Sequence, residues 1–220
     1  MKKYAVIVAG GAGTRMQSKV PKQFMELKGR PVLWYTLNAF LGAYDDLQII
    51  LVLKSEFMEH GLAIARTTTY ADRIKITVGG ETRFHSVKNG LALVESGSIV
   101  FVHDAVRCLV SADLIHRCYE QAVQYGSAVP AIHATDTIRI DNGEGPELVD
   151  RNKVYVIQTP QTFQSDALKA AFDQPYKDSF TDEASVAESA GMKVHLVEGD
   201  HANIKLTRPE DLKVAEVLLD

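Results

Sequence analysis

Residues 49–53 read Ile-Ile-Leu-Val-Leu, and no polar side chain interrupts the run. A strand with one face in water alternates apolar and polar residues, whereas a strand covered on both faces is apolar throughout. The run is therefore typical of a central strand in a parallel sheet that carries helices on both faces. It points to an α/β fold.

Short apolar runs of this kind recur along the chain and alternate with longer segments of helical period. We expect strands at residues 4–9, 48–53, 74–78, 98–102, 127–132 and 193–197. We expect helices at residues 31–41, 55–70, 82–95, 112–125, 166–172 and 182–190. A last helix should begin near residue 207, where Thr207-Arg208-Pro209-Glu210 matches a capping box with a proline in the first turn. The prediction is a mostly parallel, doubly covered Rossmann-like sheet.

One segment departs from this alternation. Residues 135–161 contain two β-like runs on either side of the turn cluster Asp-Asn-Gly-Glu-Gly-Pro-Glu at 141–147. Such a pattern favours a hairpin over a helical crossover. We expect an extended β-hairpin arm that serves as a lid or in dimerisation. The chain shows no internal repeat or linker, so residues 1–220 are expected to form one domain with the arm inserted.

Composition excludes several classes of protein. The 220 residues include 24 Lys and Arg against 28 Asp and Glu, a formal net charge of −4. Nucleic acids and anionic membranes need clustered excess cations, so neither is expected as a partner. Two cysteines are too few for a disulfide framework or a four-thiolate zinc site. The apolar run at 4–9 is too short for a signal peptide, and no run approaches the roughly 18 apolar residues of a membrane span. We expect a cytoplasmic location.

Ligands of open parallel sheets bind beyond the carboxyl ends of the strands, so we searched the loops after the first, third and fourth expected strands. The first loop contains Gly10-Gly11-Ala12-Gly13 and Arg15, with Lys22 close behind. Glycines let backbone N–H groups approach phosphate oxygens, and the cations add charge. The loop lacks the Gly-Lys-Ser/Thr that ends a Walker phosphate loop. It also has Met16 at the position where a dinucleotide-binding fingerprint needs a small residue. The alternative is a tight turn flanked by solvated cations.

The other two loops carry polar residues as well. The third strand leads into Gly79-Gly80-Glu81-Thr82-Arg83-Phe84-His85-Ser86, where paired glycines permit close approach to a flat base; a plain helix entry is the alternative. The fourth strand leads into Asp104, with Arg107 three residues on. One carboxylate with substrate phosphates suffices for Mg²⁺, and an internal Asp104–Arg107 pair is the alternative. Lys205 precedes the last helix, where either a phosphate-directed ammonium or an idle surface lysine fits.

Taken together, the loops resemble a known family. The strings AVIVAGGAGTRM, PKQF, GGETRFHSV, HDAVR, TDTI, VDRN, QTPQTF, TDEAS and NIKLTRPEDL follow one another between residue 5 and about residue 212. In this order they resemble the 2-C-methyl-D-erythritol 4-phosphate cytidylyltransferases. The resemblance implies CTP and a polyol phosphate as substrates, in-line transfer of CMP with release of pyrophosphate and no covalent intermediate. It also implies a homodimer formed through the β-arm.

The resemblance further implies a role for each matching residue. The catalytic cations would be Arg15, Lys22 and Lys205. The nucleotide would lie against Ala9, Gly10, Gly11, Ala12, Gly13, Gly80, Glu81, Arg83, Ser86, Asp104 and Ala105. Within this set, cytosine recognition falls to Gly80, Glu81, Arg83 and Ser86. Asp104 would also hold Mg²⁺ or another divalent cation. The acceptor would contact Asp104, Arg107, Thr137, Arg151 and Thr181, with the two arm residues and Thr181 acting in the neighbouring subunit.

Two positions depart from the family pattern. Cys108 stands where the family usually has proline, and Val106 stands where many members have alanine. Related ribitol-5-phosphate cytidylyltransferases also carry valine at the second position, so that activity is an alternative. A catalytically inactive CTP-binding module and a purely structural dimer are alternatives from other classes. Cys108 and Cys118 show no activating arrangement, so no cysteine nucleophile is expected.

Overall fold

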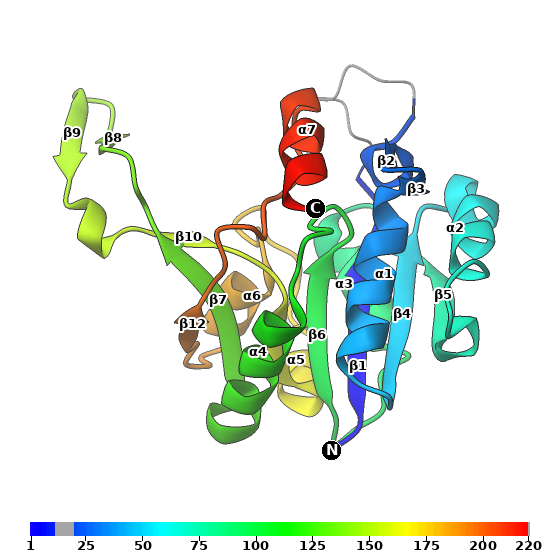
Figure 1. The fold of residues 1–220 in the computed structure, drawn as a ribbon. Helices are drawn as coiled ribbons and strands as arrows, with labels where there is room; N and C mark the ends of the chain where they lie inside the picture. Colours follow the sequence, from blue (N-terminus) through cyan, green and yellow to red (C-terminus); the bar gives the residue numbers. More distant parts are fainter. Residues whose placement is uncertain (12–19, 220) are drawn as a thin grey trace.

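The computed structural model describes residues 1–11 and 20–219. The middle layer is an eight-stranded sheet (Figure 1). Its hydrogen-bonded order is β10 (Tyr155–Ile157), β7 (Ser127–His133), β11 (Gln161–Gln164), β6 (Ile99–Asp104), β1 (Lys3–Val8), β4 (Leu47–Leu53) and β5 (Ile74–Val78), with β12 (Leu196–Glu198) paired to β7.

Most strands of this sheet are parallel. β1 pairs in parallel with β4 and β6, β4 with β5, and β12 with β7. β11 runs antiparallel between β6 and β7, and β10 runs antiparallel to β7. Every residue of Ile49–Leu53 is 0% exposed, because helices cover β4 on both faces. The predicted α/β class, with a mostly parallel and doubly covered sheet, is confirmed.

The helices form the two outer layers. α1 (Val32–Ala43), α2 (Met58–Ala65) and α4 (Ala112–Tyr125) pack on the face that Ile49 and Phe101 share. On the other face, Val52 and Val102 pack against α3 (Arg83–Leu91), α5 (Ser165–Ala171) and α6 (Glu183–Ser189). The two cores therefore use alternate residues of the same strands, as the two-residue repeat of a strand requires.

Smaller elements surround this sandwich. α7 (Pro209–Leu218) packs near the two-stranded ribbon of β2 (Glu26–Leu27) and β3 (Arg30–Pro31). The described residues also form the short 3₁₀ helices η2 (Lys22–Phe24), η3 (Ser55–Phe57), η4 (Ala71–Arg73) and η5 (Arg151–Lys153). No helix in the described part of the chain has the length and apolar composition needed to span a bilayer.

Several predicted boundaries were wrong. The helix predicted at 55–70 is η3 followed by α2, which ends at Ala65. The strand predicted at 193–197 begins only at Leu196. The last helix begins at Pro209, and the carboxylate that caps it belongs to Asp211, which accepts from the Arg208 N–H at 2.8 Å. The predicted pairing of Thr207 with Glu210 is one residue out of register, because Asp211 reaches back over the turn instead.

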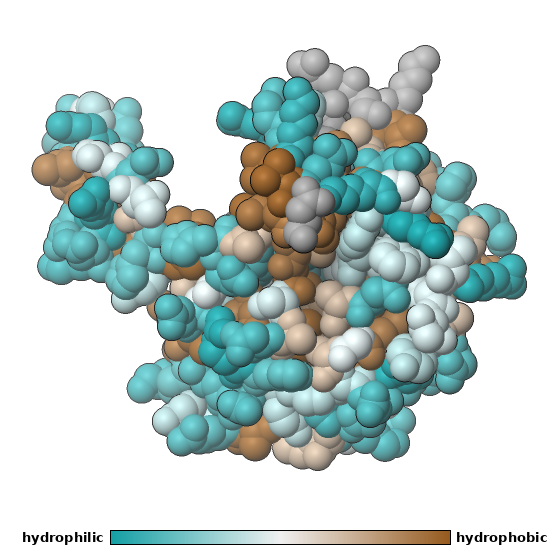
Figure 2. Space-filling model, viewed as in Figure 1, coloured by the Kyte–Doolittle hydropathy of each residue, from teal (hydrophilic) through white to brown (hydrophobic). Residues whose placement is uncertain are grey.

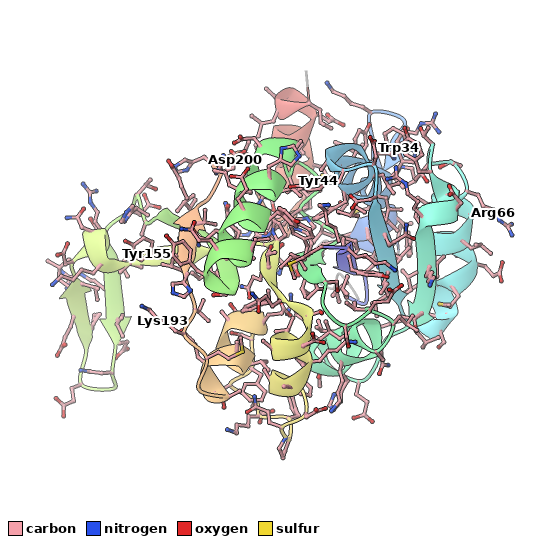
Figure 3. All side chains as sticks on the ribbon, turned by 90° about the horizontal axis from the view of Figure 1, so that it is seen from below. Trp34, Tyr44, Arg66, Tyr155, Lys193 and Asp200 are labelled. Atoms are coloured by element: carbon pink, nitrogen blue, oxygen red, sulfur yellow. The ribbon has the colours of Figure 1, made fainter. Side chains whose placement is uncertain are left out.

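The predicted hairpin is present and projects from the body of the molecule. β8 (Ile138–Asp141) and β9 (Pro146–Val149) form a separate antiparallel sheet, joined by a turn with glycine at positive φ. The hairpin stands apart from the body in the space-filling view (Figure 2) and extends to one side of the sheet, with Tyr155 near its base (Figure 3). Residues 155–157 return to the main sheet as β10, so the projecting part is shorter than 135–161. Its part in dimerisation stays a prediction.

Candidate functional site

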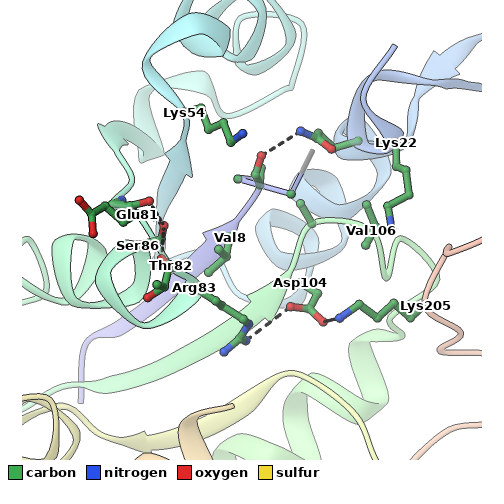
Figure 4. A pocket seen from close by; sticks show the side chains of 16 residues that line it. Val8, Lys22, Lys54, Glu81, Thr82, Arg83, Ser86, Asp104, Val106 and Lys205 are labelled. Carbon is green, nitrogen blue, oxygen red and sulfur yellow. Dashed lines mark hydrogen bonds and ion pairs between the residues drawn. The ribbon is translucent and has the colours of Figure 1, made fainter. Parts of the chain in front are cut away.

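A cavity of about 370 Å³ opens at the carboxyl ends of β1, β4, β5 and β6 (Figure 4). This is the edge where the parallel topology places ligands. Glu81 and Lys54 lie on one side of the cavity, and Lys22 and Lys205 on the other. The lining residues are Val8, Ala9, Gly10, Gly11, Lys22, Gln23, Lys54, Gly80, Glu81, Thr82, Arg83, Ser86, Asp104, Ala105, Val106 and Lys205.

A second cavity of about 160 Å³ shares three residues with the first, namely Arg83, Asp104 and Lys205. It is further lined by Arg107, Ile157, Gln158, Thr159, Gln161, Thr181 and Asp182. The two cavities therefore meet at one carboxylate with cations around it. Such an arrangement can hold two anionic ligands end to end.

The predicted site residues fall into three groups. Most of the nucleotide set lines the larger cavity, and Arg107 and Thr181 of the acceptor set line the smaller one. Thr137 and Arg151 line neither cavity of their own chain and lie on or near the arm. Ala12, Gly13 and Arg15 lie outside the described residues.

The start of the loop after β1 is held in place by a buried glutamine. Gln23 is 2% exposed, and its Nε2 donates to the Ala9 carbonyl at 2.9 Å. This bond ties η2 to the end of β1 and sets Lys22 on the cavity wall. In the described part of the chain, a Cβ atom at Gly11 would meet nothing within 4 Å, and one at Gly10 would approach only Ser86 Oγ, at 3.9 Å. Packing among the described residues thus leaves room beside both glycines for a ligand.

The loop after β5 has glycines for another reason. A Cβ atom at Gly79 would lie 2.7 Å from Ser86 Oγ, and one at Gly80 would lie 2.4 Å from His85 Cβ. The entry of α3 is therefore too close for any side chain at these positions. Ser86 Oγ accepts from the Gly80 N–H at 3.1 Å and donates to the Thr82 carbonyl at 2.9 Å. The helix entry accounts for the paired glycines without a ligand.

Asp104 is the charged centre of the site. Its carboxylate lies 2.8 Å from Lys205 Nζ, 3.4 Å from Arg83 Nη2 and 3.8 Å from Arg107 Nε. Burial would raise the pKa of this carboxyl, but the charges of Arg83, Lys205 and Arg107 outweigh it and hold the pKa well below its usual range. Asp104 is therefore ionised at neutral pH. The Asp104–Arg107 pair that the sequence offered as the alternative exists, but it is the longest of the three contacts.

Arg83 is held at the junction of the cavities by a residue that sequence reasoning missed. Glu183 is 0% exposed and takes both terminal guanidinium nitrogens of Arg83, with Nη2–Oε2 at 3.0 Å. Burial alone would lower the pKa of Arg83. The negative charges of Glu183 and Asp104 outweigh burial and raise the pKa above its usual value, so the guanidinium stays charged. The guanidinium thus lies between Glu183 and Asp104. The TDEAS string contained this glutamate, although nothing in its spacing marked it as a partner of Arg83.

Three buried titratable side chains, those of His103, Cys108 and Cys118, are neutral at pH 7. Burial lowers the pKa of His103 to about 4 and raises the pKa of Cys108 to about 11. Burial likewise raises the pKa of Cys118 to about 12. Both thiols are therefore protonated at neutral pH, as expected for residues that are not nucleophiles. Within the described residues, no three His, Cys, Asp or Glu side chains gather as metal ligands.

Lys54 also lines the larger cavity but was not among the predicted site residues. It follows β4 directly, at the same edge of the sheet as the three loops that were searched. The topological rule that selected those loops applies equally to the loop after the second strand, so this rule was sufficient to find Lys54.

A cavity at the carboxyl edge of a parallel sheet, a glycine-containing first loop and cations converging on one carboxylate define a Rossmann-like nucleotide-binding protein of the nucleotidyltransferase class. The family model for 2-C-methyl-D-erythritol 4-phosphate cytidylyltransferase matches residues 4–220. The chain belongs to this family.

Similar proteins agree with this assignment. The protein of that name from Bacteroides thetaiotaomicron is 46% identical over 219 residues, which cover 100% of both chains. The one from Phocaeicola vulgatus is 47% identical with the same coverage. Among solved structures, 2-C-methyl-D-erythritol 4-phosphate cytidylyltransferase from Francisella tularensis superposes with a TM-score of 0.82 at 32% identity, over 99% of this chain and 100% of that one.

Proposed function

We propose that this protein transfers CMP from CTP to the phosphate of 2-C-methyl-D-erythritol 4-phosphate. The products are 4-diphosphocytidyl-2-C-methyl-D-erythritol, an intermediate of non-mevalonate isoprenoid synthesis, and pyrophosphate. The chain belongs to the family of this activity. The structural observation that carries the proposal is the pair of cavities that meet at Asp104. The larger cavity is within the usual range of small-molecule sites, roughly 300–1,000 Å³, and takes the nucleotide. The smaller cavity takes the acceptor.

The main barrier to this reaction is repulsion, since the attacking phosphate and the nucleotide are both anions. Lys22 and Lys205 enter the nucleotide cavity from one side, where they offset the charge of the triphosphate. Backbone N–H groups at Gly10 and Gly11 add donors that need no side-chain ordering. Arg83 and Arg107, at the acceptor cavity, hold the incoming phosphate.

Bond making and bond breaking then balance without a base. An oxygen of the acceptor phosphate forms a bond to the α-phosphorus of CTP, and the bond from that phosphorus to the bridging oxygen of pyrophosphate breaks. The acceptor phosphate is already ionised at neutral pH, so no residue has to remove a proton. The buried thiols are protonated, which agrees with transfer that uses no covalent enzyme intermediate.

The residues at the junction fit a divalent cation. Asp104 is ionised and lines both cavities, and Mg²⁺ commonly takes one carboxylate with substrate phosphates as its remaining ligands. We propose that Asp104 holds Mg²⁺ together with the phosphates of CTP. When bound, the ion would neutralise phosphate charge.

We also propose that the active unit is a cytoplasmic homodimer. Thr137 and Arg151 lie away from the cavities of their own chain, and Ile140 and Leu148 of the hairpin are 57% and 66% exposed. An arm that crosses to a second copy would cover these apolar side chains and bring both polar residues to the partner's acceptor cavity. Both cysteines are buried and unpaired, which is compatible with a reducing compartment.

Pyrophosphate release from CTP and Mg²⁺ tests the activity. We expect 2-C-methyl-D-erythritol 4-phosphate to support faster release than ribitol 5-phosphate. Faster release with ribitol 5-phosphate would favour the alternative that Val106, on the nucleotide cavity wall, suggests. Binding of CTP without release from any polyol phosphate would instead identify a non-catalytic module.

A further inference from the structure

His103 is a buried histidine that the reaction does not use. It is the penultimate residue of β6, is 0% exposed, and packs its ring 4.9 Å from that of Phe40 on α1. Its side chain lines neither cavity. An apolar side chain would fill such a place equally well, so the polar ring calls for an explanation.

Both ring nitrogens have partners, and those partners belong to the site. Nε2 lies 3.0 Å from the Arg107 carbonyl, which can only accept, so Nε2 carries the proton and donates. Nδ1 lies 3.0 Å from Thr159 Oγ1, and the Asp104 N–H donates to the same hydroxyl at 3.2 Å. A hydroxyl that accepts from the Asp104 N–H is free to donate its own proton to Nδ1. The chain of bonds thus runs from Asp104 through Thr159 and His103 to Arg107.

The segments joined in this way all reach the acceptor cavity. Arg107 Nη1 donates to the Asn203 carbonyl at 2.8 Å, and Asn203 Nδ2 donates to the Thr159 carbonyl at 2.8 Å. The loop after β6, the loop between β10 and β11, and the segment that carries Lys205 are therefore tied together behind the cavity. Among the described residues, Gly10, Gly80 and Ser86 on the opposite wall have no hydrogen bond to this network, and that wall joins it only through Arg83 Nη2, which lies 3.4 Å from Asp104 Oδ1.

We propose that His103 is a positioning residue for the acceptor: it fixes the main chain of Arg107 relative to Asp104, so that the guanidinium and the carboxylate face the acceptor phosphate together. The inference rests on the proposed function, because it assigns the smaller cavity to the acceptor. It predicts a selective effect. Loss of the ring should weaken acceptor binding and leave the nucleotide wall unchanged.

Three variants separate the two ring bonds. His103→Gln places an amide N–H near the Nε2 position and can still donate to the Arg107 carbonyl. His103→Asn reaches only as far as Nδ1 and keeps a partner for Thr159. His103→Leu keeps neither bond. Thr159→Val and Thr159→Ser test the other end of the network, with serine retaining the hydroxyl.

Steady-state kinetics with CTP and 2-C-methyl-D-erythritol 4-phosphate is the test, with thermal unfolding of each variant. We expect His103→Leu and His103→Asn to raise the KM for the acceptor about five- to tenfold, because both lose the bond to the Arg107 carbonyl, with the KM for CTP within about twofold of the unaltered enzyme. His103→Gln should recover most of the loss, and Thr159→Ser should recover more than Thr159→Val. An unchanged acceptor KM in His103→Leu would overturn the proposal. Equal increases in both KM values that follow the loss of thermal stability would reduce His103 to a structural residue and overturn it as well.

A measurement without substrate keeps this inference separate from the proposed function. The protein is labelled with ¹⁵N-histidine and its NMR spectrum is recorded at pH 7. The signal of His103 is the one that is absent from His103→Gln, and it should be that of a neutral ring protonated at Nε2. A ring protonated at Nδ1 would overturn the assigned network whatever the reaction is. If the unaltered enzyme released no pyrophosphate while this signal was as expected, the proposed function would fail and the network would stand.

Discussion

Lys205 Nζ lies 2.8 Å from Asp104 Oδ2, at the wall that the two cavities share. The Asp104 side chain is 12% exposed and the Lys205 side chain 44%, so the carboxylate is fixed while the ammonium reaches solvent. An ammonium in this position can turn from the carboxylate to a phosphate when the nucleotide enters. The pair therefore keeps a cation at the reaction centre before the substrate arrives.

Removal of a phosphate-directed cation should slow the reaction strongly. We expect Lys22→Ala or Arg15→Ala to lower kcat at least a hundredfold, about 2.7–4 kcal/mol of transition-state stabilisation. Steady-state pyrophosphate release measures the effect. Lys213→Ala, an exposed lysine on α7, is the matched control and should leave kcat unchanged. Near-normal turnover in Lys22→Ala would contradict its assigned role.

The charge of Asp104 gives stability a predictable dependence on pH. Its pKa in the folded protein is depressed, so its contribution is fully present above the ordinary Asp value, about 4, and is lost as pH falls through the lower folded value. Lys205→Met removes one of the cations that lower this pKa. Chemical unfolding between pH 3 and pH 7 should then show a smaller loss of stability below about pH 4 in the variant, because the loss begins at the unfolded-state value in both proteins and the folded pKa of the variant is less depressed. Identical pH profiles would show that Lys205 does not influence Asp104.

Replacing Glu183 and Arg83 together should cost less stability than the two single replacements added together. Arg83→Met leaves the fully buried Glu183 carboxylate without its bidentate partner, and Glu183→Met leaves the partly exposed Arg83 guanidinium without the same bonds. Breaking a buried pair in this way typically costs about 3–5 kcal/mol of unfolding free energy. The double variant Arg83→Met with Glu183→Met removes both charges and should cost less than the sum of the single changes. Urea unfolding of all four proteins measures this coupling, and additive costs would argue against it.

The glycines of the two loops should respond differently to alanine. Gly80→Ala forces a Cβ atom to within 2.4 Å of His85 Cβ, so we expect a loss of about 1–3 kcal/mol in stability from overpacking. Gly11→Ala places its Cβ atom more than 4 Å from every atom of the described residues, so we expect an unchanged melting temperature and weaker binding of CTP. Thermal unfolding and CTP titration distinguish the two effects. Equal loss of stability in both variants would mean that Gly11 serves packing too.

Mixing two inactive variants tests the shared site. Lys22→Ala damages the nucleotide cavity, and Arg151→Ala damages the base of the arm. If an arm serves the neighbouring subunit, a mixed dimer has one site in which both elements are intact, so the exchanged mixture should regain activity. If the arm serves its own chain, every site carries one damaged element and the mixture stays inactive. Each variant mixed with itself is the control.

The sequence by itself determined the layers of the fold and the edge at which the site lies. The uninterrupted apolar run at Ile49–Leu53 requires cover on both faces, and the helices between strands supply that cover. The parallel strands that follow from it bring the loops after β1, β5 and β6 to one edge, where Gly10 and Asp104 indeed line one cavity. These properties follow from local periodicity, which neighbouring residues set.

Other features depended on the tertiary structure. Strand β11, residues 161–164, is too short for its periodicity to show that it runs antiparallel between β6 and β7. The direction of the Arg83 guanidinium depends on Glu183, which lies a hundred residues further along the chain. The partners of His103 come from separate loops. Periodicity fixes which face a residue occupies, but the direction and charge of a side chain depend on groups that meet it only after the chain has folded.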